Sequence, residues 1–514
     1  MLRIGIDVGG TNTDAVVMDG TRVVEWVKMN NSADITAGIT AALHQLLRQA
    51  GVEATQIGAV MIGTTQFTNA VVQRRDLAPV AALRLCLPAA QSLPPMVDWP
   101  EDLREAVGNC WFLAHGGYEF DGREIAPLDE AELRGIAGQI RDRGIDAVAI
   151  SAVFSPINRE MEQRAADILG NELPGAQITL SEEIGRVGLL ERENAAILNA
   201  CLRPLGARVV DAFTRALAGA GIEAPLYLTQ NDGTLMAADY AKRFPVLTFA
   251  SGPTNSMRGA AFLSGLQEAL VVDIGGTTTD VGALHHGFPR EAGAAIEVGG
   301  VRTNFRMPDV LSIGLGGGSL VQDGATLTVG PQSVGYKLVE EGLVFGGQTL
   351  TATDVAVAAG MAEIGDAEKV RELDASLVTR TLAAISSMVE VACDRMLLTP
   401  EPVPVLVVGG GSILVGDKIG VLSATRPPYF PVANAVGAAI AQISGEIDRV
   451  YALAELPREQ ALADAKRQAT ERAVEAGAVA DSVEIVEVEE VPLAYLPSNA
   501  TRIRVKAVGD LARG

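Results

Sequence analysis

One eight-residue pattern, Asp-x-Gly-Gly-Thr-x-Thr-Asp, occurs twice in this chain and limits its fold more than any other feature. The first copy runs from Asp7 to Asp14, and the second runs from Asp273 to Asp280. Short apolar runs precede and follow each copy, so each one predicts a strand, a tight Gly-rich turn and a second strand. Two copies that share six residue types at matching positions are hard to explain as turn chemistry alone.

The residue types of this pattern suit a phosphate group. Glycine lets the backbone approach an anion closely, and consecutive N–H groups and threonine hydroxyls supply hydrogen-bond donors. The aspartate that ends the first strand of each copy can hold a magnesium ion or orient a water molecule, because carboxylates are usual magnesium ligands. A single copy is as easily an ordinary hairpin turn. Two copies favour a pair of turns that hold a polyphosphate from opposite sides of a cleft.

A third Gly-rich segment lies late in the chain. The run Val405–Val408 predicts a buried strand, Gly-rich residues 409–412 follow it, and an apolar helix opens at Asn434. Such glycines would let the backbone pass close to a purine or ribose, although a strand-to-helix turn would use them too. The two hairpins and this segment, in this order, resemble the actin-like ATPase superfamily. The resemblance implies an α/β fold in which two actin-like (ribonuclease H-like) domains flank a nucleotide cleft.

The composition argues against several classes of function. The 514 residues include 41 basic and 63 acidic side chains, for a net charge of −22, and no basic cluster, which argues against a nucleic-acid partner. The four cysteines are far apart, which argues against a disulfide framework, a zinc ribbon or an iron–sulfur cluster. The chain enters a strand without a signal peptide, and no apolar run reaches the roughly 20 residues that a bilayer requires. We therefore expect a cytoplasmic protein that does not enter a membrane.

The order of predicted elements divides the chain into three parts. Residues 1–190 form a first domain that begins with a β-β-β-α-β unit and carries an inserted α/β segment at about 79–122. Residues 191–400 form the second actin-like domain, and residues 401–514 carry the adenosine motif and return to the first domain. A long helix interrupted at Pro204 leads toward the second domain, and the apolar run 432–443 predicts another helix.

Further segments narrow the resemblance to one family. They keep the family's order along residues 4–439: Gly63-Thr64-Thr65 with Asn69-Ala70, Arg74-Arg75, Phe154-Ser155, Glu162, Glu191-Arg192 with Asn199-Ala200, Pro204, Ser251-Gly252-Pro253, and Ile313-Gly314 with Gly316 to Ser319. On these segments the chain resembles the hydantoinase/oxoprolinase family, specifically its ATP-binding hydantoinase A-type subunit. Such enzymes use ATP to hydrolyse hydantoins, oxoproline and larger lactams, and related proteins are subunits of ATP-dependent carboxylases that act on ketones.

The resemblance implies a reaction that these residues can support. A lactam carbonyl is a poor electrophile, and transfer of the γ-phosphoryl group to its oxygen gives an imidate phosphate that water can attack. This transfer depends on positioning and on charge stabilisation by magnesium and N–H donors. The chain is therefore expected to be an ATP-dependent cyclic amidohydrolase that uses ATP and Mg²⁺ and acts on a small cyclic amide.

The expected site residues fall into three groups. The phosphates are expected between Gly9, Gly10, Thr11 and Asn12 on one side and Gly275, Gly276, Thr277 and Thr278 on the other, with the adenosine near Gly409, Gly410, Gly411 and Ser412. Asp7 and Asp273 are expected to be catalytic, as metal ligands or as carboxylates that orient water, although each could instead bond to its own turn. Thr64, Thr65 and Asn69 are candidates for contact with the substrate.

Two departures from the family pattern limit what carries over. Long members have histidine where this chain has Met161 and Leu311, and neither replacement can act as an acid, a base or a strong ligand. The chain is also expected to lack much of the C-terminal region of those members, as in a short subgroup. We therefore expect it to activate a cyclic amide and to need a second hydantoinase-type subunit, within an oligomer. The alternatives are a small-molecule kinase of the same superfamily, the ATP-binding subunit of a carboxylase, and a non-catalytic ATP-dependent regulator.

The four histidines follow no common pattern. His115 lies in the insertion and is either near a substrate or in an exposed loop. His285-His286 follows a predicted strand and is most simply a hairpin turn, and His44 lies in a predicted helix without an assigned role.

Overall fold

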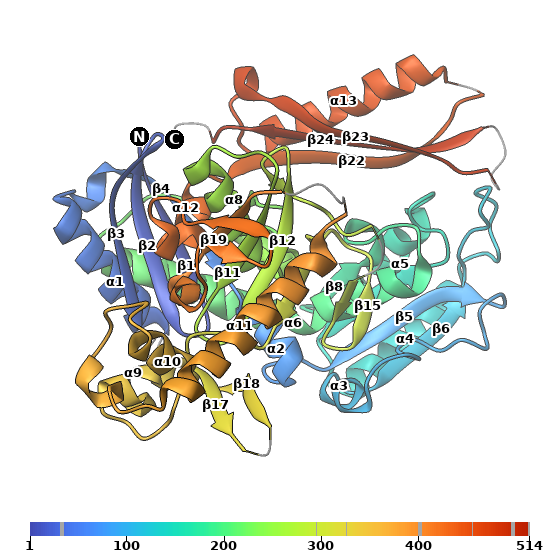
Figure 1. Cartoon of the computed structure of the whole chain (residues 1–514). Helices are drawn as coiled ribbons and strands as arrows, with labels where there is room; N and C mark the ends of the chain where they lie inside the picture. The colour runs from blue at the N-terminus through green and yellow to red at the C-terminus, as the bar shows by residue number, and fades with distance from the viewer. Residues whose placement is uncertain are drawn as a thin grey trace.

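The structure, a computed structural model of the whole chain, describes residues 1–30, 35–293, 296–324, 326–398, 403–454, 456–494 and 499–511. It confirms the predicted α/β class, because helices pack on the faces of several sheets (Figure 1). A nine-stranded sheet contains strands from both ends of the chain, and a seven-stranded sheet contains the second copy of the motif. A four-stranded sheet forms an inserted part.

The nine-stranded sheet holds the first copy of the motif. Its strands are β1 (Leu2–Val8), β2 (Asn12–Asp19), β3 (Arg22–Asn30), β4 (Ile57–Thr64), β9 (Leu226–Thr229), β10 (Thr234–Ala237), β22 (Gln442–Ala452), β23 (Glu484–Pro492) and β24 (Ala500–Gly509). They lie in the order β23-β24-β22-β10-β9-β4-β1-β2-β3. β4 pairs parallel with both β1 and β9, so the carboxyl ends of these three strands share one edge, where ligands commonly bind in α/β proteins.

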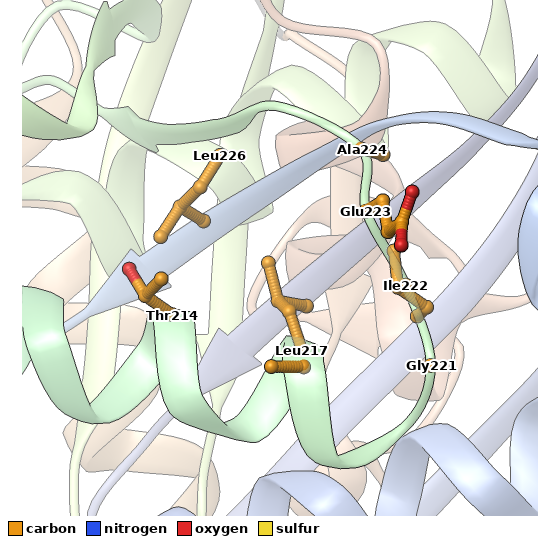
Figure 2. Close-up of a pocket in the computed structure, with 8 residues that line it drawn as sticks. Thr214, Leu217, Gly221, Ile222, Glu223, Ala224 and Leu226 are labelled. Carbon is orange, nitrogen blue, oxygen red and sulfur yellow. The ribbon is translucent and has the colours of Figure 1, made fainter.

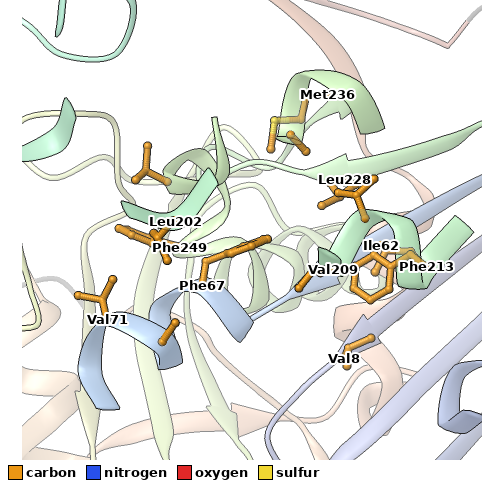
Figure 3. Packing of buried hydrophobic residues seen from close by; sticks show 14 of the residues in the cluster. Val8, Ile62, Phe67, Val71, Leu202, Val209, Phe213, Leu228, Met236 and Phe249 are labelled. Carbon is orange, nitrogen blue, oxygen red and sulfur yellow. The ribbon is translucent and has the colours of Figure 1, made fainter. Parts of the chain in front are cut away.

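Long helices cover one face of this sheet. α1 (Ile35–Ala50) and α6 (Leu189–Gly219) pack there, because alternate residues of each strand point to the same side. Figure 3 shows strand side chains meeting side chains of α2 (Gln66–Gln73) and α6, among them Val8, Ile62, Leu228, Phe67, Val209 and Phe213. Burial of each such side chain stabilises the fold by about 1.5–3 kcal/mol.

Two further helices, α8 (Ser251–Ser264) and α12 (Ala433–Ala439), lie between the two large sheets. Their backbones touch, since a Cβ atom added to Gly437 would lie 1.8 Å from a carbonyl oxygen of α8. α12 is equally close to β1, because a Cβ atom on Gly5 would lie 2.1 Å from a carbonyl oxygen of α12. Any side chain at these glycines would push the backbones apart, so they set how closely the late part of the chain approaches the first strand.

The seven-stranded sheet holds the second copy of the motif. Its strands are β11 (Ala269–Ile274), β12 (Thr279–His285), β13 (Phe288–Pro289), β16 (Val310–Ile313), β19 (Val405–Val408), β20 (Lys418–Ile419) and β21 (Leu422–Thr425). They lie in the order β13-β12-β11-β19-β21-β20, with β16 paired to β12. α8 packs on one face, and α10 (Ala352–Ala358) and α11 (Ala375–Met396) pack on the other.

The inserted part is a parallel sheet with the order β6-β5-β7-β8. Its elements are β5 (Val80–Leu87), α3 (Glu101–Ala106), β6 (Cys110–His115), α4 (Glu130–Asp142), β7 (Ala147–Ala152), α5 (Glu160–Glu172) and β8 (Gln177–Leu180). The sheet therefore extends well beyond the segment 79–122 that the sequence suggested as an insertion. A buried ion pair ties it to α6, with Arg84 Nη2 2.5 Å from Glu193 Oε1.

Smaller elements complete the fold: β14 (Ile296–Val298), β15 (Val301–Thr303), β17 (Ser319–Asp323), β18 (Leu327–Ser333), α7 (Ala238–Arg243), α9 (Leu338–Glu341) and α13 (Arg458–Glu475). The helix α13 covers β22 and β24 with four buried alanines at every fourth position, Ala461, Ala465, Ala469 and Ala473. This spacing places all four on one side of the helix.

Two expected helices differ from the structure. α6 runs through Pro204 without a break, because buried contacts along the helix outweigh the one backbone hydrogen bond that proline cannot make. The apolar run 432–443 is not a single helix, since α12 ends at Ala439 and β22 begins at Gln442. There the chain pairs with β10 and joins the nine-stranded sheet, so tertiary pairing overrides the local pattern.

The expectation that no apolar segment is long enough to span a bilayer is wrong, because one helix has the required length and composition. α11 is 22 residues long and is apolar enough to meet both criteria. In the structure, however, Ile385, Val389 and Met396 of α11 belong to the core beneath the seven-stranded sheet. These residues therefore give the helix a packing role in that core.

Candidate nucleotide-binding site

Both copies of the motif form the same turn. The Gly9 N–H donates to the Asn12 carbonyl oxygen at 3.1 Å, and the Gly275 N–H donates to the Thr278 carbonyl oxygen at 2.9 Å. Each bond closes the turn between two antiparallel strands, β1 with β2 and β11 with β12. Equal sequence positions therefore have equal backbone roles in the two hairpins.

The two turns touch where the large sheets face each other. A Cβ atom added to Gly276 would lie 2.7 Å from the Thr11 Oγ1 atom. The equivalent glycine of the first hairpin is Gly10, and an added Cβ atom there would meet no atom of the described residues within 4 Å. The structure thus brings the two copies of the motif face to face, with little space between Gly276 and Thr11.

Four aspartates of the two hairpins surround this contact. Asp7 lies opposite Asp14 and Asp273 lies opposite Asp280; the first pair is buried and the second is half-buried. Burial, together with the charges of Asp14 and Asp273, raises the pKa of Asp7 to about 7. Burial also raises the pKa of Asp273, and it raises the pKa of Asp280 to about 6. Close carboxylates that resist ionisation in this way suit a divalent cation, which would favour their charged forms.

Two residues from distant parts of the chain hold these carboxylates. Lys28 of β3 places its Nζ atom 2.7 Å from Asp14 Oδ1, and Asn434 Nδ2 donates to Asp7 Oδ2 and Asp14 Oδ2, each at 2.9 Å. Gly410 lies beside Lys28, since an added Cβ atom would be 3.2 Å from the Lys28 Cε atom. The roles of both residues were not predicted from the sequence. A signal for Lys28 did exist, because β3 follows the first hairpin directly and places Lys28 opposite Asp14.

The first turns of α8 reach both motif aspartates. The Ser256 hydroxyl donates to Asp273 Oδ2, and Asn255 lies beside Asp7. A Cβ atom on Gly63 would lie 2.7 Å from Asp7 Oδ1 and 2.3 Å from the Asn255 side-chain nitrogen. Among the described residues, Asp7 Oδ1 and Asn255 Oδ1 have no hydrogen-bond partner although both are buried. Buried polar atoms are rarely left this way, so a metal ion, a water molecule or a polar group of a substrate would fit here.

The predicted adenosine segment packs on the second hairpin. Gly409 has a φ of +85°, and a Cβ atom there would lie 2.3 Å from Asp273 Oδ1. A Cβ atom on Gly411 would lie 2.6 Å from the Gly275 carbonyl oxygen. Ser412 is fully buried, and its Oγ atom has no hydrogen-bond partner in the described part of the chain. These glycines therefore let the segment lie directly beside the carboxylates.

A second Gly-rich loop supports the hairpin from behind. The Gly317 N–H donates to the Gly275 carbonyl oxygen at 3.0 Å, and the Gly318 N–H donates to the Gly276 carbonyl oxygen at 2.8 Å. Within the described ranges, no acceptor bonds to the backbone N–H groups of Gly276 and Thr277. The loop thus occupies the turn's acceptors and leaves its donors available, as an anion site requires.

The predicted substrate residues follow β4 but differ in exposure. Thr64 is buried, and its backbone N–H and carbonyl oxygen lie 3.3 and 3.1 Å from the Ser251 hydroxyl. Thr65 is half-buried and Asn69 is exposed, and Asn69 Nδ2 donates to Thr65 Oγ1 at 3.4 Å. Thr64 therefore makes structural contacts, whereas Thr65 and Asn69 present polar atoms near the first turn of α2.

Two sizeable cavities lie away from the hairpin contact. A cavity of about 480 Å³ opens between the end of α6 and the amino end of β9, as Figure 2 shows; its lining is Thr214, Leu217, Ala218, Gly221, Ile222, Glu223, Ala224 and Leu226. A larger cavity of about 1070 Å³ lies between the inserted part, the loop after β9 and β22. None of the predicted site residues lines either cavity.

The larger cavity is bordered by charged side chains that already pair with one another. Arg306 lies within 2.8–3.8 Å of four carboxylates, those of Asp232, Glu291, Glu446 and Glu487. These ion pairs connect the loop after β9 with the last strands of the chain. Such a network stabilises the contact between the parts that it connects, and we assign no chemistry to it.

Comparisons with known proteins show the family of the chain. The profile described as the hydantoinase/oxoprolinase N-terminal region matches residues 3–173, and the profile described as hydantoinase/oxoprolinase matches residues 192–396. The caprolactamase alpha subunit of Pseudomonas jessenii is 27% identical over 388 residues, which cover 70% of this chain and 54% of the relative. The acetophenone carboxylase gamma subunit of Aromatoleum aromaticum is 26% identical over 413 residues, with coverage of 70% and 53%. The chain thus spans about half the length of these curated relatives.

The fold is also similar to a solved structure. The crystal structure of the ATP-dependent caprolactamase from Pseudomonas jessenii superposes with a TM-score of 0.78 at 20% sequence identity. The match covers 99% of this chain and 88% of that chain. At this level of identity the comparison establishes the fold.

Proposed function

Since the chain belongs to the hydantoinase/oxoprolinase family, we propose that it is an ATP-dependent enzyme subunit that phosphorylates the carbonyl oxygen of a cyclic amide. The observation that carries this proposal is the group of four aspartates, two from each hairpin, with Lys28 as a nearby cation. Such a group suits a reaction in which phosphate and a divalent cation meet in a site shielded from water.

ATP would bind with its phosphates between the two turns. The unbonded N–H groups of Gly276 and Thr277 would donate to phosphate oxygens from one side, and Gly10, Thr11 and their neighbours would approach from the other. Because the turns touch at Gly276 and Thr11, entry of the nucleotide requires the two halves of the protein to separate. They would then close again, with the Gly276–Thr11 contact beside the bound phosphates. The segment 409–412 lies beside the same carboxylates and is the place that we assign to the adenosine.

Magnesium would be held by Asp7 and Asp273. Asn434 occupies Oδ2 of Asp7, and Ser256 occupies Oδ2 of Asp273, so each carboxylate keeps Oδ1 for a metal or its water. Among the described residues Asp7 Oδ1 has no hydrogen-bond partner, and this observation fits the assignment best. Magnesium, when bound, would neutralise phosphate charge and align the reacting groups.

In the proposed reaction, the amide oxygen attacks the γ-phosphorus, the bond from that phosphorus to the bridging oxygen breaks, and ADP leaves with the bonding electron pair. The product is an imidate phosphate. Water then adds to its carbon, the ring C–N bond breaks as nitrogen takes a proton, and the resulting acyl phosphate is hydrolysed to a carboxylate and inorganic phosphate. Asp7 and Asp273 would serve the first of these steps, because the magnesium ion that they would hold stabilises the charge of the transferred phosphoryl group.

A carboxylase subunit is the second candidate, since the acetophenone carboxylase relative is about as similar as the lactamase relative. The same site would then phosphorylate a ketone through its enolate oxygen. A kinase that releases a stable phosphate ester is a third reading, and no relative named above favours it.

We also propose that a partner subunit completes the hydrolysis. The relatives are named as subunits, which supports a multi-subunit enzyme. Met161 is buried, with its Sδ atom 3.1 Å from the Gly117 backbone nitrogen, and Leu311 packs toward α11, so neither position offers an acid, a base or a strong ligand. A cytoplasmic location and an oligomeric state belong to the same proposal.

The experiment measures ADP release by purified protein with ATP and magnesium in three arms. One arm contains hydantoin, oxoproline or caprolactam, another contains acetone or acetophenone with bicarbonate, and the third contains no acceptor; products are identified by mass spectrometry. We expect ADP release that depends on the amide, with little ring-opened product until a partner subunit is added. Release that depends only on the ketone would select the carboxylase reading, and a stable phosphorylated product would select the kinase. Stoichiometric ring opening by this chain alone would contradict the need for a partner.

A further inference from the structure

Two histidines and a glutamate converge at the end of the second hairpin that is remote from its Gly-rich turn. His285 ends β12, His286 begins the turn that follows, and Glu268 precedes β11. Glu268 Oε1 lies 3.1 Å from His285 Nδ1 and 3.8 Å from His286 Nδ1. The metal-ligand atoms of all three residues lie within 4.8 Å of one another, and all three side chains are exposed.

The backbone holds these residues in place. Ala269 pairs with Leu284 at the end of the β11–β12 ladder, so Glu268 lies opposite His285 one position further on. The His286 N–H donates to Glu268 Oε1 at 2.9 Å, and that bond is the largest cause of the lowered pKa of the Glu268 carboxyl. His286 has a φ of +51°, a left-handed conformation that an ordinary residue adopts only at a cost.

The turn is also fixed from the protein side. Arg258 Nη1 donates to the Gly287 carbonyl oxygen at 2.9 Å, and its guanidinium lies over the Phe288 ring, 3.7 Å from the centroid. The Gly287 N–H donates to the Gln267 carbonyl oxygen at 2.9 Å. The backbone of the turn would therefore need little rearrangement when an ion binds to the side chains.

We propose that Glu268, His285 and His286 form a surface site for a divalent transition metal such as Zn²⁺, Ni²⁺ or Cu²⁺. Imidazole nitrogen with a carboxylate oxygen suits these borderline ions. Ligand atoms about 2.1 Å from a tetrahedral zinc ion are about 3.4 Å from one another, close to the 3.1 and 3.8 Å seen between Glu268 Oε1 and the two imidazoles. Water would fill the remaining positions.

Such an ion would clamp the base of the second phosphate hairpin. The site joins the start of β11 to the end of β12. Asp273 and Asp280 lie at the other end of the same strand pair. Asp273 lies five positions after Glu268 along the strand, a distance of about 17 Å, so the ion would not touch the reacting groups. Its effect is therefore on the stability of the hairpin, and it does not depend on the function proposed above.

The test uses tag-free full-length protein freed of metal with a chelator and titrated with zinc, nickel or copper salts by calorimetry. One ion should bind per chain with a dissociation constant on the order of 10 µM, and saturating zinc should raise the melting temperature by about 2–4 °C. His285→Ala and His286→Ala should each weaken zinc binding at least tenfold. Copper-loaded protein should show hyperfine splitting from two nitrogens in its electron paramagnetic resonance spectrum.

The matched control is His115→Ala. His115 Nδ1 lies 3.1 Å from Glu132 Oε2, so it offers the same imidazole–carboxylate contact with one histidine instead of two. This variant should bind zinc as the unaltered protein does. Equal zinc affinity in His285→Ala, or the absence of a binding heat at zinc concentrations far above the protein, would overturn the site. Binding that leaves the melting temperature unchanged would overturn the clamp.

Discussion

The contact between the two phosphate turns allows a direct test of whether the halves of the protein close on each other during the reaction. Gly276→Ala would add a Cβ atom 2.7 Å from Thr11 Oγ1 and 3.1 Å from Thr11 Cβ and Cγ2. Carbon atoms in ordinary contact are about 3.5–4.0 Å apart, so the turns must separate or their neighbours must shift. Overpacking of this kind costs about 1–3 kcal/mol, which corresponds to a loss of about 5- to 150-fold in the closed arrangement.

If closure is needed for phosphoryl transfer, Gly276→Ala should lower kcat/KM for amide-dependent ADP release by that factor. Thr11→Gly removes the atoms that the new Cβ would meet, so Gly276→Ala should cost less than about twofold in a Thr11→Gly background. Gly10→Ala changes the equivalent position in the first hairpin, where the added Cβ atom would meet no described atom within 4 Å, so it should cost less than Gly276→Ala. Melting temperatures of these variants show whether each is folded.

Equal losses from Gly276→Ala in both backgrounds would refute the reasoning, because they would show that the two turns do not meet in the reactive state. Titration with ATP and magnesium separates the two possible stages. Unchanged ATP affinity with lower kcat assigns the loss to closure, whereas weaker affinity assigns it to binding.

Four further predictions concern charged groups that are buried or half-buried. Burial raises the pKa of Asp7 from 3.8 to about 7, so the folded protein holds this proton more tightly than the unfolded chain, and stability should fall as the pH rises from about 4 to about 7. Asp7→Asn should remove that pH dependence and, at a pH above about 7 without magnesium, raise the melting temperature; a pH profile of melting that Asp7→Asn leaves unchanged would contradict the burial argument. Asp7→Ala or Asp273→Ala should lower ATP turnover by on the order of a hundredfold. Lys28→Met removes the cation beside Asp14 and should weaken binding of magnesium and ATP at least tenfold by calorimetry, whereas equal affinity would show that Lys28 serves only the fold. Arg84→Met leaves Glu193 buried without its partner and should lower the free energy of unfolding by about 3–5 kcal/mol in urea denaturation, and adding Glu193→Leu should restore part of the loss if the ion pair is the cause.

The sequence by itself determined the hairpins and the class of the fold. Each hairpin is encoded by neighbouring residues: two apolar strands, two glycines for a tight turn and an aspartate at the end of the first strand. The order of the hairpins and the adenosine segment then indicated the superfamily, and further segments indicated the family that the profiles match. These features were readable because strand alternation and turn chemistry depend on residues only a few positions apart.

The composition of the site was decided by tertiary structure. Asn434 bonds to Asp7 across 427 positions of sequence, and Ser256 bonds to Asp273 across 17. Asn434 reaches its place because Gly5 lets α12 lie on β1 and Gly437 lets α8 lie on α12. No local pattern shows which of the 55 glycines of the chain has this role.

The insertion and the last strands show the same limit. The strands β5, β6, β7 and β8 pair in one parallel sheet, which extends the inserted part to Leu180. The strand β22 joins the nine-stranded sheet, although the local sequence pattern favoured a helix there. Local sequence sets the backbone preferences of each segment, but it does not determine which distant segment will bury its apolar face. That choice depends on the packing of the whole molecule, where burial of one side chain outweighs a local preference of several tenths of a kcal/mol.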